Sequence, residues 1–529
     1  MMRLTTLLAT GAAVILTAVS GLAQPAPSPG TPHRGGQVVI GSIQEPNVLN
    51  PLLTNLTVSQ EAFNLVLDAL TKIDDKGSVV PFLARELPSV STDGKTYTYR
   101  LRRDVKWHDG RPFTSADVVF THNAMMDPKN RIIGRPSGFL NVESVRAPDA
   151  YTVVFTLKEP QAPWIYTWTS LGILPRHVLE GRDLNTASWN TAPTVGLGPF
   201  VFVEWVSGSH ILVRRNSDYY LGAPNVAVVV YRIIPDSNAL LAAMEKGDID
   251  MRFATTAEQV PIIERNPGWK VWRTPAYSVF HFTINNAHPI MSDRRVRQAL
   301  THALDKKGIT QTILRGLVEP AWTPITTPSW AHDSAVVKFE YDPGKARQLL
   351  DEAGWRLNPA SGVREKDGQR LAFSIVSIAG DVERQQIVQI AQRQWREVGA
   401  AVDVSLVDVG TFVTIMQSGN FAIGYGFWGA GPDPDSMLFT WWHSKGNNWL
   451  RLRLPQLDAL IDEARVIQDR RKRRDLYLRA QKLIAQEATN IFLYERVFFD
   501  ATKTRINGFR PVAGGGVNTW NAHEWWVGR

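Results

Sequence analysis

The densest group of chemically useful side chains lies in residues 424–444, GYGFWGAGPDPDSMLFTWWHS. This segment places Asp433 and Asp435 close to three tryptophans and one histidine. Paired carboxylates perform acid and base catalysis in glycosidases, which hold the two groups at least ~5 Å apart across a substrate. Two aspartates separated by a single proline do not favour that arrangement. We expect them either to cap the helix that follows or to contact a ligand, and the sequence leaves both roles open.

The rest of the chain lacks the common catalytic patterns. None of the eleven histidines has a partner at the spacing of a zinc site, and neither a phosphate-binding loop nor a Gly-x-Ser-x-Gly turn is present. The absence of cysteine excludes a thiol nucleophile, a thiolate metal site, disulfides and a lipid-modified N-terminal cysteine. We therefore expect no enzymatic activity, no metal site and no cofactor, with a secreted hydrolase as a remote alternative.

Alternating strands and helices must position the aspartate segment. The pattern runs strand, helix, strand, helix, strand at residues 371–378, 382–399, 401–409, 411–419 and 421–428. In open α/β sheets, ligands bind beyond the carboxyl ends of the strands. We therefore expect Trp428, Gly429 and Ala430 to line a ligand cleft, where the indole offers a flat apolar face. A place in the core is the alternative for Trp428.

An earlier part of the chain has a different pattern. Residues 94–126 hold an alternating strand, a turn, and then Thr114 and Asp117 at the spacing of a capping box. Together with a further strand at 151–157, this predicts a separate α+β unit over residues 58–195. The chain as a whole is predicted to be α/β.

The N-terminus has the pattern of an export signal. Residues 1–23 contain one charge, an apolar stretch and small residues before Gln24, and residues 24–36 form a flexible leader rich in proline, serine and glycine. We expect cleavage after Ala23, a periplasmic location and no stable membrane insertion. The formal net charge of +8 is dispersed, and its one dense run, residues 469–475, is interpreted as a solvated turn or helix face. We therefore expect no nucleic-acid partner.

Several motifs together resemble one family, the solute-binding proteins of the oligopeptide, dipeptide and nickel branch of ABC importers. They occur in the family's order and read YTYRLRRDVKWHDGRPFTSADVVF, GLGPFVFVEW, RRNSDYYLGAPNVAVVVYRIIPD, AMEKGDID, RRVRQALTHALDKKGI and YDPGKARQLLDEAGW. The resemblance implies a two-lobed periplasmic-binding-protein fold that closes over a ligand, with an extra domain inserted in lobe one. It also implies capture of a solute and its delivery to an inner-membrane ABC permease by a protein that we expect to be monomeric. A receptor that feeds a sensor instead is a rival interpretation.

The resemblance also implies domain boundaries. The signal peptide is predicted at residues 1–23 and the leader at 24–36. Lobe one is predicted to comprise residues 37–57, 196–281 and 497–529, with the inserted domain at 58–195. Lobe two is predicted at residues 282–496.

The same comparison raises a question about the ligand. Peptide-binding relatives carry an aspartate shortly after the tryptophan, and some carry an arginine three positions before it. Here those positions hold Ala430 and its neighbours, and Tyr425. The spacing is similar to that of the nickel-binding branch, but Asp435 stands where that branch has a histidine. We expect a peptide-like solute, with a saccharide, a nickel chelate or an organic acid as alternatives.

Other candidate contacts follow predicted strands. Residues 42–51 come after the first strand of lobe one and offer Glu45 and Asn47, while residues 277–286 run between the lobes and offer Tyr277 and Asn285. Each of these residues can instead stabilise its own turn or strand.

Overall fold

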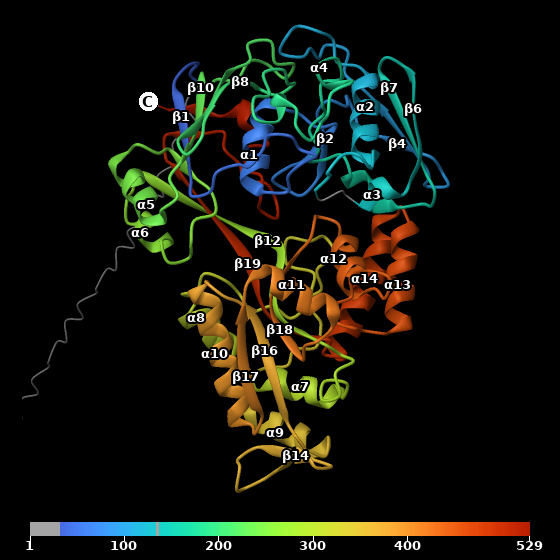
Figure 1. Ribbon diagram of the computed structural model, residues 1–529, viewed down its shortest axis with the longest axis vertical. Helices are drawn as coiled ribbons and strands as arrows, with labels where there is room; N and C mark the ends of the chain where they lie inside the picture. The colour runs from blue at the N-terminus through green and yellow to red at the C-terminus, as the bar shows by residue number, and fades with distance from the viewer. Residues whose placement is uncertain (1–31, 134–136, 529) are drawn as a thin grey trace, which may run out of the picture.

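The computed structural model describes residues 32–133 and 137–528. The predicted signal peptide and most of the leader lie outside these residues. Two lobes are visible in Figure 1, joined by the long strands β12 (Trp269–Ile284) and β19 (Asn490–Lys503). Among the described residues, no helix has both the length and the hydropathy of a membrane span.

One ten-stranded sheet runs through both lobes, and β12 and β19 lie near its middle. In spatial order its strands are β17 (Ala401–Val407), β16 (Ala372–Ile378), β18 (Ile423–Gly429), β12, β19, β11 (Met251–Arg252), β1 (Gln37–Ser42), β10 (Val228–Ile233), β9 (His210–Arg215) and β8 (Phe200–Val206). The pairing of β12 with β19 is irregular at two places, between Pro275 and Val279 and between Phe280 and His281. β12 continues unbroken past residue 281, so the lobe boundary there stays a prediction.

The predicted alternation of strands and helices in lobe two is confirmed. β16 pairs in parallel with both β17 and β18, and α10 (Val382–Glu397) and α11 (Val409–Ser418) connect the three strands. Asp381 and Asp408 cap these helices by accepting hydrogen bonds from backbone amides. β18 runs antiparallel to β12, which enters lobe two from lobe one, and β16 is parallel to β18, so the carboxyl ends of β16 and β18 point toward lobe one.

The remaining helices of lobe two surround these strands. They are α7 (Arg294–His302), α8 (Lys306–Thr312), α9 (Pro343–Glu352), α12 (Pro434–Trp442), α13 (Pro455–Val466) and α14 (Arg470–Gln486), beside a small sheet of β13 (Arg356–Leu357), β14 (Arg364–Lys366) and β15 (Gln369–Arg370). The basic run 469–475 forms the first turns of α14, with Asp469 as its cap. Most of the run is exposed as expected, but Arg473 is buried.

The segment predicted as an insertion packs on lobe one. Its elements are α1 (Thr57–Val66), β2 (Thr71–Ile73), β3 (Val79–Pro81), β4 (Ser89–Val90), β5 (Thr96–Arg100), α2 (Ser115–Met126), α3 (Ser137–Leu140), β6 (Val142–Asp149), β7 (Thr152–Leu157) and α4 (Arg176–Leu179), with 3₁₀ turns at Ala162–Tyr166 and Ser188–Asn190. The predicted capping box at Thr114 and Asp117 is present. One continuous apolar core joins most of these elements, including α1, α2, β5 and β7, to β1, β9 and β10.

Lobe one is completed by two short helices and the C-terminal residues. These elements are α5 (Ser237–Lys246), α6 (Val260–Glu264), β20 (Ile506–Asn507), β21 (Trp526–Val527) and a 3₁₀ turn at Ala522–Glu524. The loop between β19 and the C-terminus passes beside both long strands, which places it at the junction of the lobes.

Candidate functional site

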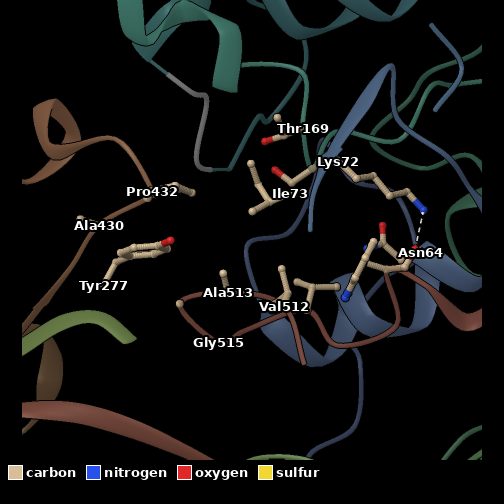
Figure 2. Close-up of a pocket in the computed structure, with 15 residues that line it drawn as sticks. Asn64, Lys72, Ile73, Thr169, Tyr277, Ala430, Pro432, Val512, Ala513 and Gly515 are labelled. Atoms are coloured by element: carbon tan, nitrogen blue, oxygen red, sulfur yellow. Dashed lines mark hydrogen bonds between the residues drawn. The ribbon is translucent and has the colours of Figure 1, made fainter. Parts of the chain in front are cut away.

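A pocket lies where the two lobes meet, and its wall comes from both. Its cavity volume is about 170 Å³, and it is open to solvent. Figure 2 shows Tyr277 and the loop 430–432 on one side, with the loop 512–517 and Ile73 on the other. The complete lining is Asn64, Lys72, Ile73, Thr169, Ser170, Tyr277, Ala430, Gly431, Pro432, Val512, Ala513, Gly514, Gly515, Val517 and Trp520.

Glycines allow the loop 512–517 to approach the long strands closely. Gly514 and Gly515 have φ angles of +80° and +72°, which side chains rarely adopt. A Cβ atom on Gly514 would overlap the ring of Tyr277, and one on Gly515 would overlap the ring of Phe498. The shape of the pocket therefore depends on these two positions having no side chain.

The charged side chain in the pocket lining, Lys72, is already paired. Its Nζ atom lies 2.5 Å from Oδ1 of Asp68 and donates to the carbonyl oxygen of Trp520 at 3.4 Å. Asp68 in turn accepts hydrogen bonds from the hydroxyls of Tyr219 and Tyr220 at 2.8 and 2.9 Å. The ammonium group is thus held in the wall, and a solute meets mainly uncharged groups.

Uncharged polar groups remain available in this lining. Asn64 supplies an amide, Ser170 a hydroxyl and Tyr277 a phenol. The hydroxyl of Thr169 donates to the carbonyl oxygen of Tyr166 at 2.8 Å, so it offers a solute only its acceptor lone pairs. Burial raises the pKa of Tyr277, so its hydroxyl stays protonated at neutral pH and can donate a hydrogen bond. Such a surface suits neutral polar groups such as peptide amides.

The structure brings together two of the residues expected from the sequence, Tyr277 and Ala430. The amide of Ala430 donates to the carbonyl oxygen of Tyr277 at 2.9 Å, and both residues line the pocket. Gly429 immediately precedes Ala430, pairs with Ser278 and is exposed, but it does not line the pocket. The expected position of this loop beyond the carboxyl end of β18 is therefore the observed one.

Trp428 faces the interior of lobe two. Only 4% of its surface is exposed, and its ring stacks on Trp441 with centroids 4.6 Å apart and planes 5° apart. Trp442 and His281 contact the same indole edge-on. This is the core position that the sequence left open as the alternative, and Trp428 does not line the pocket.

The two aspartates are held by arginines of neighbouring helices. Arg473 donates to both carboxylate oxygens of Asp433, at 2.6 and 2.8 Å, and Asp433 also caps α12. Asp435 lies 3.3 Å from Nε of Arg465, and burial raises its pKa to about 7. Capping by Asp433 is confirmed, and neither carboxylate lines the pocket.

Four other expected residues lie elsewhere and stabilise their own surroundings. Glu45 accepts hydrogen bonds from Nε1 of Trp205 and the amide of Gly208, and Asn47 accepts from the hydroxyls of Thr54 and Ser59.

The other two lie within lobe two. Asn285 donates to two backbone carbonyls, those of Gly419 and Phe421. Tyr425 is completely buried and its ring packs on Phe282, with centroids 4.7 Å apart. Contact of these four residues with a ligand therefore stays a prediction.

Sequence reasoning missed most of the lobe one wall. Residues 512–517 follow the last long strand, and the run Gly514-Gly515-Gly516 was the available signal for a close backbone approach. Lys72 and Thr169 had no such signal, because they come from β2 and from a bend of the inserted segment, far in the sequence from the loop at 430–432. Within residues 32–133 and 137–528, no group of three His, Asp or Glu side chains has the arrangement of a metal site.

Comparison with known proteins places this geometry in context. The sequence profile of the bacterial extracellular solute-binding proteins, family 5 (middle), matches residues 78–449. The oligopeptide-binding protein AppA of Bacillus subtilis is 32% identical over 517 residues, which cover 95% of this chain and 93% of AppA.

Two solved structures of solute-binding proteins are also similar to this chain. The structure of AppA from Bacillus subtilis with a nonapeptide has a TM-score of 0.77 and 30% identity, and covers 94% of this chain and all (100%) of that one. NikZ from Campylobacter jejuni with Ni(L-His) has a TM-score of 0.77 and 28% identity, and covers 92% of this chain and 99% of that one.

Proposed function

Because the chain belongs to the family 5 bacterial extracellular solute-binding proteins, we propose that it captures a peptide and presents it to the permease of an ABC importer. Solute binding for import is the role of the family, and the peptide is the specific part of the proposal. We further propose that the protein acts in the periplasm as a monomer, without catalysing a reaction.

The observation that carries the proposal is the position of the pocket between two lobes joined by β12 and β19. A solute that contacts both walls stabilises the closed arrangement of the lobes by its differential affinity for that state. Tyr277 belongs to a connecting strand, Ala430 to lobe two and Gly514 to lobe one. A solute bound in this pocket would therefore contact both lobes and a strand that connects them.

The chemistry of the wall favours a peptide over a charged metabolite. A peptide backbone alternates amide donors and carbonyl acceptors, which match the hydroxyls and amide of the lining residues and the backbone of the two glycine-containing loops. The named relative AppA is an oligopeptide-binding protein, which agrees with this assignment.

A nickel chelate is the second candidate, because the similar structure of NikZ holds Ni(L-His). A chelate brings its own metal ligands, so it does not require a protein cluster of metal-binding side chains. Saccharides and organic acids remain weaker alternatives, since no observed feature of the pocket singles them out.

A thermal-shift panel with the purified protein tests the proposal. The panel contains alanine peptides of increasing length, a set of oligosaccharides and nickel with histidine. We expect a peptide to raise Tm in proportion to the logarithm of its concentration, because it binds the folded state alone. A rise with a saccharide or with nickel and histidine, and with no peptide, would contradict the proposed ligand.

A further inference from the structure

A second feature of the lobe junction lies on the α10 face of the sheet. There the guanidinium of Arg496, on β19, lies between two aromatic rings. Its Cζ atom is 5.0 Å from the ring centroid of Phe427 and 4.3 Å from that of Phe498. The side chain is half-buried. Planar guanidinium groups stack well on aromatic faces, and this stacking fixes the direction of their N–H groups.

Arg496 has no anionic partner in the part of the chain that the structure describes. It forms neither a hydrogen bond nor an ion pair there, unlike Arg384, which lies 3.1 Å from Asp381. Burial lowers the pKa of Arg496, and the positive charge of Arg384 acts in the same direction. A cation withdrawn from water without a partner is energetically costly, so a site of this kind favours binding of an anion.

An exposed aromatic ring and a second cation lie beside Arg496. The ring of Phe427 is 39% exposed, and Arg384 lies on it at 5.8 Å from the centroid. Two guanidinium groups therefore flank one accessible apolar surface. Glu383 lies nearby, but it accepts a hydrogen bond from the hydroxyl of Tyr494, and burial raises its pKa.

The position of Arg496 connects this cluster to the junction of the lobes. Arg496 lies opposite the irregular stretch of β12 that contains Tyr277, and Phe427 is near the carboxyl end of β18. Phe498 is the ring that Gly515 of the pocket loop approaches. The cluster thus adjoins the proposed solute pocket, on the other side of the glycine loop.

We propose that Arg496 binds a carboxylate of the transported solute, with Phe427 and Phe498 as apolar walls and Arg384 as a second positive charge. The guanidinium fork matches the geometry of a carboxylate and can donate two parallel hydrogen bonds to it. This inference rests on the proposed function, because the carboxylate belongs to the captured solute. The carboxylate is either the C-terminus of a peptide or an acidic side chain.

The test compares Arg496→Gln with the wild type by calorimetric titration. The probes are trialanine and hexaalanine, each as a free acid and as a C-terminal amide, and Ala-Glu-Ala amide. We expect Arg496→Gln to lower the affinity for the carboxylate-bearing probe about 10- to 100-fold and to leave unchanged the affinity for the amides of trialanine and hexaalanine, which have no carboxylate. If Arg496→Gln weakens binding of the free acids, Arg496 binds the C-terminal carboxylate. If it weakens binding of Ala-Glu-Ala amide, Arg496 binds an acidic side chain.

Two further variants control for folding and for general charge. Arg496→Lys keeps the charge without the fork and should restore part of the affinity. Arg393→Gln removes a cation of α10 whose side chain is 68% exposed, and it should change nothing. If Arg496→Gln lowers the affinity for free acids and for amides equally, or changes the affinity for none of the probes, the inference is overturned.

Benzoate separates this inference from the proposed function, because it carries a carboxylate and a ring but no peptide. If no peptide binds the wild type, the proposed ligand is wrong, and the site is judged by benzoate alone. We then expect benzoate to raise Tm of the wild type and of Arg393→Gln but not of Arg496→Gln. An equal response of wild type and Arg496→Gln would overturn the carboxylate site.

Discussion

Arg473 and Asp433 form a two-bonded ion pair inside lobe two, with nitrogen to oxygen distances of 2.6 and 2.8 Å. The pair joins Asp433, the residue that caps α12, to the second turn of α14, and Tyr477 accepts a further hydrogen bond from Arg473. The loop 430–432 therefore runs from the end of β18 to Asp433, which the ion pair holds in place. The ion pair positions the pocket wall although it does not touch the pocket itself.

Asp433→Ala should be strongly destabilising, because it leaves Arg473 buried without its anion and removes the cap of α12. We expect a loss of about 3–5 kcal/mol in the free energy of unfolding, measured with urea. Asp403→Ala is the control, since that side chain is 93% exposed, and it should change the value by less than about 0.5 kcal/mol. A loss below about 1 kcal/mol for Asp433→Ala would show that the pair contributes little.

Asp435 predicts a distinctive dependence of stability on pH. Burial raises its pKa from the usual 3.8 to about 7, so the folded protein holds a proton that the unfolded chain releases. The corresponding stability is complete below about pH 4 and is lost as the pH rises to about 7. The free energy of unfolding of the wild type relative to Asp435→Asn should fall in that window by up to about 1.4 kcal/mol per pH unit.

Comparison with Asp435→Asn isolates this one group. Glu61 and Asp500 also have raised pKa values, of about 8 and about 6, but they are present in both proteins and their contributions cancel. Urea unfolding at a series of pH values gives the difference directly. A difference that is constant or grows with pH would contradict the assignment to Asp435.

Gly514→Ala should narrow the proposed pocket. Its Cβ atom would overlap the ring of Tyr277, and the ring would have to move into the space for the solute. Gly208→Ala is a matched control, because Gly208 has a similar φ of +72° and nothing within 4 Å of the added atom. We expect both variants to lose about 1–2 kcal/mol of stability from backbone strain. Only Gly514→Ala should also lower peptide affinity, by about tenfold or more.

Trp428 and Tyr277 should respond in opposite ways to truncation. Trp428→Ala removes a buried ring that stacks on Trp441, so we expect a loss of about 3–5 kcal/mol in stability and unchanged peptide affinity in the folded fraction. Tyr277→Ala should lower peptide affinity with a smaller effect on stability, because that residue lines the pocket. If Trp428→Phe keeps full stability but loses affinity, the tryptophan contacts the solute after all.

Local signals predicted much of the fold. The spacing of Thr114 and Asp117 indicated the start of α2, and runs rich in apolar residues indicated the strands of lobe two. Orientation within a strand was harder to predict. Phe427 and Trp428 are consecutive residues, so their side chains lie on opposite faces of β18. Both faces carry large rings, and the sequence therefore does not indicate which of the two rings is exposed.

The candidate site was less predictable because it depends on distant partners. Asp433 is neutralised by Arg473, which stands 40 positions later in a run that looked like a solvated surface. The pocket wall likewise combines Lys72 with Tyr277 and Gly514, and only the assembled lobes bring them together. Spacing within one segment carries no information about such pairs.

The most direct test of the central claim is mass spectrometry of the solute that denaturation releases from protein purified out of its native host. If the protein captures peptides for an ABC importer, the released fraction should contain peptides in an amount comparable to the protein. The Tyr277→Ala and Gly514→Ala variants should release less. Release of a saccharide or a nickel chelate in their place, with no peptide, would contradict the account.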